Sequence, residues 1–296
     1  MPTFGIMAHP GKQLFREAFP SILALFKRSG VPIICADNIM KEPPSDFPEC
    51  QVMPEDDIPA HCDLIFAFGG DGTMLRTIHK VKYYQTPVLG VNVGGLGFLT
   101  EIPLEQFEEM YRMILEGKYR IENRMMLEGR LKDDPEPIYA LNEITVEKGY
   151  STRVIEVQTH INGRYFNDYV ADGLIVSTAT GSTGYSLSSN GPIMMPTSRC
   201  IILNPICPHS LTNRPVIVPD DSHLCMKIYT DQPFALLSAD SQDVRDIPNR
   251  SELTIRKASF VARLVKHPDS DYFALLRNKL GWGVDFRNKL RWSHNR

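Results

Sequence analysis

The first 116 residues alternate short apolar runs with longer stretches in which apolar side chains recur every three or four positions. Short runs rich in Ile, Val and Phe predict buried strands, and the three-to-four spacing predicts helices with one apolar face. Strands that alternate with helices in this way are typical of a parallel sheet covered by helices. The predicted strands are Phe4–Ala8, Val31–Ala36, Asp63–Phe68 and Pro87–Val93.

Three helices are predicted in the same part of the chain. The first covers about 15–29, and Pro20 inside it predicts a kink or a late start because proline breaks the helical hydrogen-bond pattern. The second covers about 74–82, and the third covers about 103–117. Segment 41–59 contains several prolines and acidic residues, and it is predicted to be an exposed loop.

After about Tyr119 the period becomes strand-like and stays so for nearly 150 residues. Asn162-Gly163 lies between two such runs and predicts a tight type I′ hairpin. Many short strands in series are typical of an all-β sandwich or barrel. The predicted strands are Met125–Leu131, Ile138–Glu147, Val154–Ile161, Arg164–Val170, Gly173–Ser177, Cys200–Leu203, Val216–Val218, Leu224–Tyr229, Phe234–Ser238, Leu253–Lys257 and Phe260–Lys266.

The change of period predicts two domains. Residues 1–118 are expected to form an α/β domain with a Rossmann-like parallel sheet. Residues 119–270 are expected to form an all-β, sandwich-like domain. Residues 271–296 regain helical spacing, and they are expected to pack back on the first domain.

The amino-acid composition excludes several classes of protein function. Hydrophobic residues are 43% and charged residues 23%, as in ordinary globular proteins. The 32 Lys and Arg against 35 Asp and Glu lack the basic excess of a nucleic-acid binder. No apolar run approaches the roughly 18 residues of a membrane span, and no signal peptide is evident, so we expect no membrane partner and a cytoplasmic location. Neither the six cysteines nor the eight histidines show metal-binding spacing, so no protein-held metal site is predicted.

The first chemical motif is Gly69-Gly70-Asp71-Gly72-Thr73, which follows a buried strand and opens a helix. Glycines let a polyphosphate approach the backbone, and a helix N-terminus attracts anions. A carboxylate among them fits a group that accepts the proton of an attacking hydroxyl or contacts Mg²⁺. The alternative is a tight turn in which Asp71 only caps the helix.

Three further motifs are candidates for ligand binding. Gly94–Phe98 follows the next strand, so it lies at the same end of the sheet as Asp71, with Phe98 as an apolar wall. Asn142-Glu143 interrupts an apolar strand, although a solvated face would explain it as well. The run from Asp172 to Ser188 ends an apolar strand in many hydroxyls around Tyr185, which suits a base or a sugar better than a flexible linker does.

Taken in this order, the four motifs resemble the bacterial NAD kinases. The resemblance covers nearly the whole chain, including Pro208-His209-Ser210-Leu211 and the ending Leu280-Gly281-Trp282. The first motif is also shared with diacylglycerol-type lipid kinases, so the later motifs carry the specificity. Two positions depart from the family pattern, namely Gly184, where Ala is commoner, and Ser241 in Asp240-Ser241-Gln242, where Gly is commoner.

The resemblance implies transfer of the γ-phosphoryl group of ATP to the 2′-hydroxyl of the adenosine ribose of NAD, with Mg²⁺ or another divalent cation. It implies that Asp71 is the catalytic residue, acting as a base or through the metal. It also implies a homo-oligomer, a dimer or tetramer. The binding residues that it implies are Gly70, Gly72, Thr73, Phe98, Asn142, Glu143, Asp172, Thr183, Gly184, Tyr185 and Ser188.

Two other functions stay open from the residues. A lipid kinase would share the Gly-Gly-Asp-Gly-Thr turn and would phosphorylate a diacylglycerol or a sphingoid base. The hydroxyl-rich loop Thr180–Ser188 argues against it. A non-catalytic NAD(P)-binding protein would bind the dinucleotide without turnover, and retention of Asp71 gives that hypothesis no support.

Overall fold

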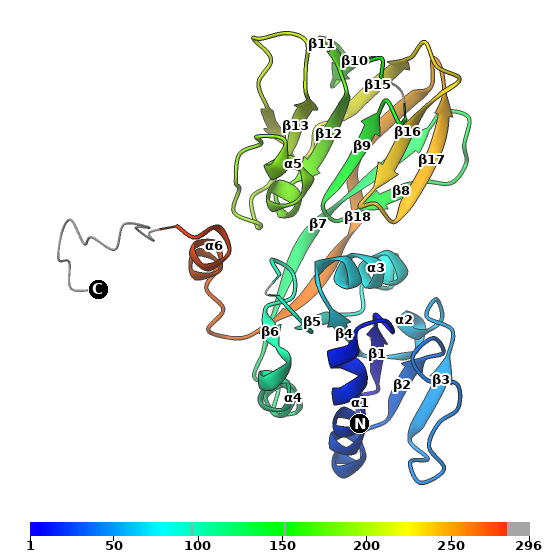
Figure 1. Ribbon diagram of the computed structural model, residues 1–296, viewed down its shortest axis with the longest axis vertical. Helices are drawn as coiled ribbons and strands as arrows, with labels where there is room; N and C mark the ends of the chain where they lie inside the picture. Colours follow the sequence, from blue (N-terminus) through cyan, green and yellow to red (C-terminus); the bar gives the residue numbers. More distant parts are fainter. Residues whose placement is uncertain (96, 151, 283–296) are drawn as a thin grey trace, which may run out of the picture.

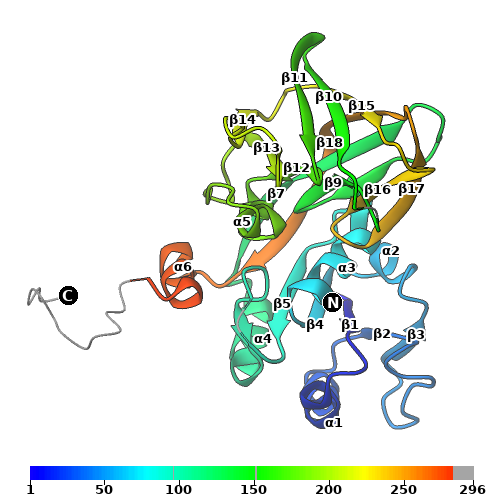
Figure 2. The same cartoon turned by 45° about the horizontal axis from the view of Figure 1, so that its top comes forward.

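The structure is a computed structural model, and it describes residues 1–95, 97–150 and 152–282. Figure 1 shows a helix-covered part at the bottom and a strand-rich part at the top, and Figure 2 shows the same division from a second direction. Within the described residues, no helix is long and apolar enough to cross a membrane.

A parallel sheet forms the core of the lower part. Its strands lie in the order β3-β2-β1-β4-β5, and β6 also pairs with β5 in parallel. The residues of β1 and β4 are buried throughout, as expected of a parallel sheet that is covered on both faces. The bounds are β1 Phe4–Ala8, β2 Ile33–Ala36, β3 Cys50–Met53, β4 Leu64–Gly69, β5 Val88–Asn92 and β6 Ile102–Pro103.

Helices connect these strands. The first begins at Gln13 and runs through Pro20 to Ser29, so the predicted late start is wrong. Gly30 ends it with φ 64°, a left-handed conformation that glycine adopts without strain. The bounds are α1 Gln13–Ser29, α2 Ile58–His61, α3 Asp71–Val81, η1 Lys82–Tyr84, η2 Leu104–Gln106 and α4 Phe107–Leu115.

The upper part is built from antiparallel strands. Six of them form one sheet in the order β14-β13-β12-β9-β16-β17. Its apolar face packs in one core cluster with side chains of β7, β10, β15 and β18. The bounds are β7 Arg120–Leu131, β8 Ile138–Ala140, β9 Glu143–Glu147, β10 Ile155–Ile161, β11 Arg164–Ala171, β12 Gly173–Thr178, η3 Thr180–Thr183, α5 Tyr185–Ser188, β13 Cys200–Ile206, β14 Val216–Pro219, β15 Leu224–Tyr229, β16 Phe234–Ala239, β17 Asp243–Pro248, β18 Glu252–Lys266 and α6 Tyr272–Leu280.

The antiparallel strands of the upper part that lie outside the six-stranded sheet continue the parallel sheet. Strand β18 pairs with β5 in parallel at Leu264 and Val88, and with β15 antiparallel along its first residues. A single 12-stranded sheet therefore passes from the lower part into the upper part. The α/β part followed by a β-rich part is confirmed, and one sheet is shared between the two parts. Strand β7, paired with β18 from Arg120–Lys266 to Leu131–Leu253, reinforces the junction.

Several local predictions need correction. The segment 41–59 is not entirely a loop, because it holds β3 and part of a short helix. The predicted strand 138–147 is two strands, which leaves Leu141 and Asn142 between them. Strand β17 has the sequence Asp-Val-Arg-Asp-Ile-Pro at the edge of its sheet and carries too little apolar pattern to be predicted. The Asn162-Gly163 hairpin is confirmed, with φ 52° and 76°.

The domain boundary at residue 119 stays a prediction, since one sheet crosses it. The expectation that 271–296 packs on the first part also stays a prediction. Its residues 283–296 lie outside the described residues.

The aromatic core gives the first testable prediction. The Phe66 ring is fully buried and contacts the rings of Phe4, Phe26 and Phe107 at centroid distances of 5.2, 5.6 and 5.3 Å. Phe66→Ala is expected to lower the free energy of unfolding by about 3–5 kcal/mol, as measured by urea denaturation. Leu14→Ala, at a side chain 54% exposed, is the control and should change it by less than about 0.5 kcal/mol.

Candidate active site

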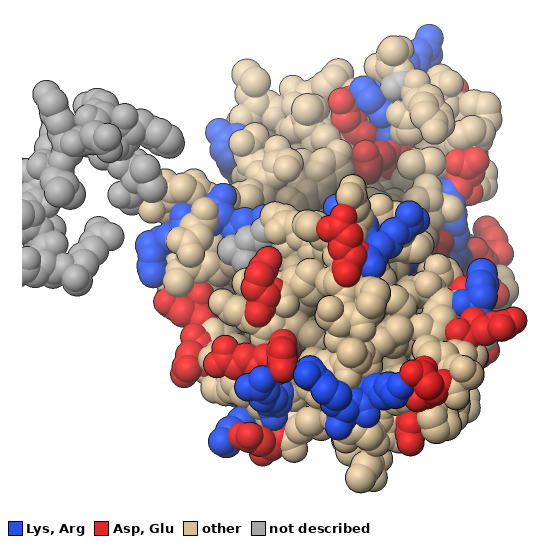
Figure 3. Space-filling model, turned by 60° about the horizontal axis from the view of Figure 1, so that its bottom comes forward, with Lys and Arg blue, Asp and Glu red and all other residues tan. Residues whose placement is uncertain are grey.

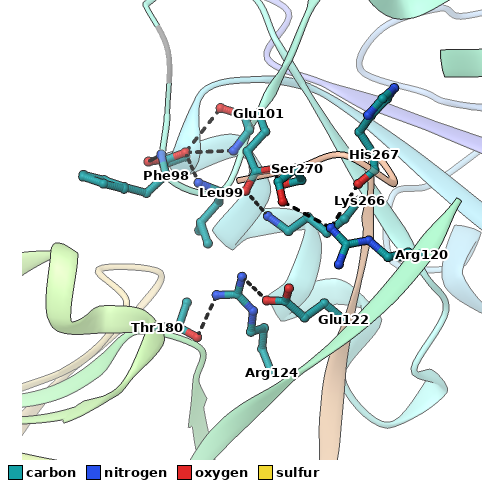
Figure 4. Close-up of polar contacts among 12 residues, drawn as sticks. Phe98, Leu99, Glu101, Arg120, Glu122, Arg124, Thr180, Lys266, His267 and Ser270 are labelled. Atoms are coloured by element: carbon teal, nitrogen blue, oxygen red, sulfur yellow. Dashed lines mark hydrogen bonds and ion pairs between the residues drawn. The ribbon is translucent and has the colours of Figure 1, made fainter. Parts of the chain in front are cut away.

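Asp71 is the first residue of α3, and its carboxylate joins two glycine-rich turns. Oδ2 accepts the N–H of Phe98 at 2.8 Å, and Oδ1 accepts the N–H groups of Leu99 and Thr100 at 2.9 and 3.2 Å. The Thr100 hydroxyl donates to Oδ1 as well, at 3.3 Å. Figure 4 shows Phe98 and Leu99 at this contact. The predicted approach of the two loops is thus a direct hydrogen-bonded contact.

Two other residues make this contact possible. At Gly97, a Cβ would lie 2.0 Å from Oδ1 of Asp71, so only glycine lets the backbone come this close. The Asn92 side chain donates to the carbonyl of Gly95 at 2.8 Å and to the Thr100 hydroxyl at 3.1 Å, which holds the loop from inside. The loop after β5 is therefore ordered by two polar side chains, Asp71 and Asn92, in addition to the buried side chains of Val93 and Leu99.

The glycines of the first motif differ in their surroundings. A Cβ at Gly69 would meet the Thr73 side chain at 2.1 Å, so Thr73 packs against the strand end and is buried. At Gly70 and Gly72 a Cβ would meet no atom within 4 Å. The backbone at these two positions is therefore open to an approaching ligand.

A second carboxylate repeats the arrangement of Asp71. Asp240, whose side chain is fully buried, accepts the N–H groups of Leu141, Asn142 and Glu143 at 2.6, 2.8 and 2.9 Å. The ring of His79, on α3, lies 3.0 Å from its Oδ2. Sequence reasoning noted Asp240 only as part of a departure from the family pattern. Its partners are backbone amides, which leave no sequence signal.

Asn142 and Glu143 lie where β8 ends and β9 begins. The Asn142 carbonyl accepts the N–H of Thr178 at 2.8 Å, and a Cβ at Gly181 would lie 2.2 Å from that carbonyl oxygen. The structure therefore brings Asn142-Glu143 against the loop that follows β12, as the motifs predict for a shared site. Gly184 approaches the same pair, with its Cβ position 3.0 Å from Oε2 of Glu143.

Two polar atoms of this pair are buried without a partner in the described structure, Oδ1 of Asn142 and Oε2 of Glu143. Burial and then the Asp240 carboxylate raise the pKa of Glu143 to about 8, although the N–H of Tyr185 donates to Glu143. A buried acceptor without a donor costs stability. Oδ1 of Asn142 is therefore suited to accept a hydrogen bond from a ligand, and Oε2 of Glu143 is suited to donate one when the carboxyl is protonated and to accept one when it is ionised.

Two other predicted binding residues, Asp172 and Tyr185, lie next to β12 and at the start of α5. Asp172 precedes β12 and pairs with Lys148 at 2.7 Å, at the opposite end of β12 from Thr178. The Tyr185 hydroxyl lies 3.4 Å from Oε2 of Glu147, so its ring reaches back from α5 toward that end. Burial and then the Glu147 carboxylate raise the pKa of Tyr185.

Thr183 and Ser188 complete the predicted set. The Thr183 hydroxyl donates to the Thr180 carbonyl at 3.3 Å, and Ser188 is exposed at the end of α5. Asp71 and Phe98 lie on the lower part of the molecule, and the residues from Asn142 to Ser188 lie on the upper part. The His79–Asp240 contact is one link between the two groups.

A cavity of about 550 Å³ borders this link. It lies between α3 and the turn at 242–244 and is lined on the α3 side by Arg76, His79 and Lys80. It does not include Asp71 or Glu143, so it neighbours the candidate site without containing it.

Comparison with known proteins agrees with the motifs. The family models of the ATP-NAD kinase N-terminal domain and C-terminal domain match residues 24–119 and 141–267. The chain belongs to the ATP-NAD kinase family. The resemblance stated from the motifs is thereby confirmed.

Individual relatives support the same family. An NAD kinase of Geotalea daltonii is 42% identical over 231 residues, which are 77% of this chain and 81% of the relative. An NAD kinase of Sulfurimonas denitrificans is 32% identical over 281 residues, 94% of this chain and 96% of the relative. The lipid kinase and the non-catalytic binding protein are not favoured by these relatives.

Solved structures of similar fold include two kinases. Yeast NADH kinase complexed with NADH has a TM-score of 0.89 at 28% identity, covering 98% of this chain and 90% of that one. An NAD kinase from Archaeoglobus fulgidus in complex with ATP has a TM-score of 0.74 at 27% identity, covering 94% and 98%. The family's two-part fold, with a mixed sheet and an antiparallel sheet, is thus the fold of this chain.

Glu143 makes a prediction about pH. Because its pKa rises from 4.5 to about 8 on folding, the folded chain binds more protons between these values. Its contribution to stability is complete below pH 4.5 and is lost as the pH rises through about 8. Urea denaturation between pH 5 and 8 should show a steeper loss of stability for the native chain than for Glu143→Gln. Parallel curves would contradict the prediction, and Glu105→Gln, at an exposed carboxylate, is the control.

Proposed function

We propose that this chain is an ATP-dependent NAD kinase that transfers the γ-phosphoryl group of ATP to the 2′-hydroxyl of the adenosine ribose of NAD. Membership of the ATP-NAD kinase family supports it. The observation that carries the mechanism is the position of Asp71, between the open backbone at Gly70 and Gly72 and the amides of the loop 98–100.

Asp71 is proposed to take the proton of the 2′-hydroxyl. A carboxylate oxygen accepts about two hydrogen bonds in good geometry. Oδ1 of Asp71 already accepts three, whereas Oδ2 accepts only the N–H of Phe98. Oδ2 therefore keeps the capacity to accept the hydroxyl, and the amides hold it in a fixed direction. Fixed orientation of base and nucleophile is the main contribution that a protein makes to phosphoryl transfer.

The adenosine portion is proposed to bind at the Asn142-Glu143 pair. The unpartnered Oδ1 of Asn142 would accept a hydrogen bond from a ribose hydroxyl or from the adenine amino group, and the unpartnered Oε2 of Glu143 would form one with a ribose hydroxyl. Tyr185 offers an aromatic face that is 38% exposed, and the hydroxyls of Thr183 and Ser188 lie in the same loop and helix. Phe98 and Thr73 border the phosphate side, and Asp172 lies toward the nicotinamide end.

The divalent cation is proposed to arrive with ATP. Mg²⁺ is commonly held by one or two carboxylates together with substrate phosphates. In the described part of the chain no group of three His, Cys, Asp or Glu could hold a metal by itself, and Asp71 supplies a single carboxylate. This donor set fits a cation bound mainly to the triphosphate, which would neutralise charge on the transferred group.

The remaining expectations are part of the proposal. The resemblance implies a homo-oligomer, a dimer or tetramer, in the cytoplasm. Exposed aromatic side chains on the edge strand β11, Tyr165 at 59% and Phe166 at 38%, are compatible with a contact between subunits. Residues 1–118 and 119–270 would be the phosphate-binding and dinucleotide-binding parts.

The function is tested by the Asp71→Asn variant. Purified native protein with NAD, ATP and Mg²⁺ should form NADP, measured with an NADP-specific dehydrogenase. The variant should lose two or more orders of magnitude in kcat, roughly the contribution of a positioned base. NAD affinity, measured by calorimetry, should change much less, because the Asn142-Glu143 pair is untouched.

Two results would contradict this account. Absence of NADP formation by the native protein would refute the kinase. Unchanged kcat in Asp71→Asn would remove Asp71 from the chemistry while leaving the family membership intact.

A further inference from the structure

The candidate site raises a problem of charge. Its ionisable side chains are mostly carboxylates, among them Asp71, Glu143, Asp172 and Asp240, whereas both proposed substrates carry phosphates. Like charges repel, and phosphate groups in proteins are normally met by Lys, Arg or backbone N–H groups. Cations near the loop 97–101 are therefore candidates for binding the donor.

Two cations near this loop are already neutralised. Lys266 on β18 is buried and pairs with Glu101, and Arg124 on β7 is buried and pairs with Glu122. Figure 4 shows the Lys266–Glu101 pair above the Arg124–Glu122 pair, near β7 and β18, which cross between the parts. Each cation has a carboxylate partner and little exposure, so neither is free to contact a phosphate.

Lys279 is different. It lies on α6, its side chain is exposed, and its ammonium is 5.5 Å from the centroid of the Phe98 ring. None of the described carboxylates is within ion-pair distance of it. Figure 3 shows Lys and Arg side chains gathered where α6 lies, at the left of the view.

The position of α6 is defined by several contacts. The Asp271 side chain caps it by accepting the N–H of Phe273 at 2.9 Å. Leu275 and Leu276 are buried, and the Tyr272 hydroxyl lies 3.3 Å from the Met194 carbonyl. The helix is therefore anchored on its inner face, and Lys279 is carried to the loop by a fixed element.

Phe98 connects Lys279 to the proposed chemistry. Its N–H is bound to Oδ2 of Asp71, and its ring lies beneath the Lys279 ammonium. A phosphoryl donor aligned with a hydroxyl at Asp71 would lie beside this loop, over the open backbone of Gly70 and Gly72. An ammonium at its edge, with no ion-pair partner among residues 1–95, 97–150 and 152–282, would meet a negatively charged phosphate chain at close range.

We propose that Lys279 binds the phosphate chain of the phosphoryl donor, which makes α6 part of the donor site. This inference rests on the proposed function. The ligand class is a nucleoside triphosphate or a polyphosphate, recognised through its phosphate oxygens.

The test compares three variants of the full chain. Lys279→Gln removes the charge, Lys279→Arg keeps it, and Arg277→Gln removes a charge from another exposed position of the same helix. A lost charge-assisted hydrogen bond predicts an increase of about tenfold or more in the KM for ATP in Lys279→Gln. The KM for NAD should stay within about twofold. Lys279→Arg should restore most of the ATP affinity, and Arg277→Gln should match the native protein. Equal melting temperatures would show that the fold is intact.

An unchanged KM for ATP in Lys279→Gln, or an increased KM for NAD alone, would overturn the proposal. Calorimetry with ATP, and competition by inorganic tripolyphosphate, provide a test that does not need turnover. Tripolyphosphate should displace ATP from the native protein and bind Lys279→Gln more weakly; equal binding to both would overturn a phosphate contact. If the native protein makes no NADP, the proposed function fails, and these binding measurements still decide the role of Lys279.

Discussion

The candidate site depends on one kind of interaction, a carboxylate that accepts hydrogen bonds from successive backbone amides. Asp71 does this for the loop 98–100, and Asp240 does it for 141–143. Irregular backbone has no ladder partner to satisfy its N–H groups, so a loop close to a ligand needs another acceptor. A fixed charge at that point orders the loop and also remains available for chemistry.

Asp71 binds a loop of the lower part, and Asp240 binds a segment of the upper part. The two parts contact each other at Asp240. Asp240 binds the amides at the start of β9 and also meets His79 of α3, so the upper part is tied to the helix that Asp71 begins. The paired strands β7 and β18 form a second connection through the continuous sheet. A site made by two parts needs such connections, because catalysis requires its groups to keep their relative positions.

Charged side chains surround the candidate site on both parts of the molecule. At the proposed adenosine side, Asn142 and Glu143 leave buried polar atoms without a partner in the described structure, and burial is the main cause of the raised pKa of Glu143. Lys266 on β18 and Lys279 on α6 lie next to the loop that Asp71 orders, and Arg124 on β7 reaches the Thr180 hydroxyl of the upper part. Both signs of charge are therefore present where the two parts meet.

The sequence by itself determined β1, β2, β4, β5 and the helices α1, α3 and α4 of the first part, the Asn162-Gly163 hairpin, the family and the motif that contains Asp71. These depend on local periodicity, turn residues and short spacing, which a linear reading can detect. Only the tertiary structure decided that β18 links the parallel strands to antiparallel strands of the same sheet, that Asp240 binds the amides of 141–143 and that Lys279 lies over the Phe98 ring. Their partners are backbone amides 97 to 99 residues away and an aromatic ring on another element. No local pattern records such contacts, because they form only when distant segments pack together.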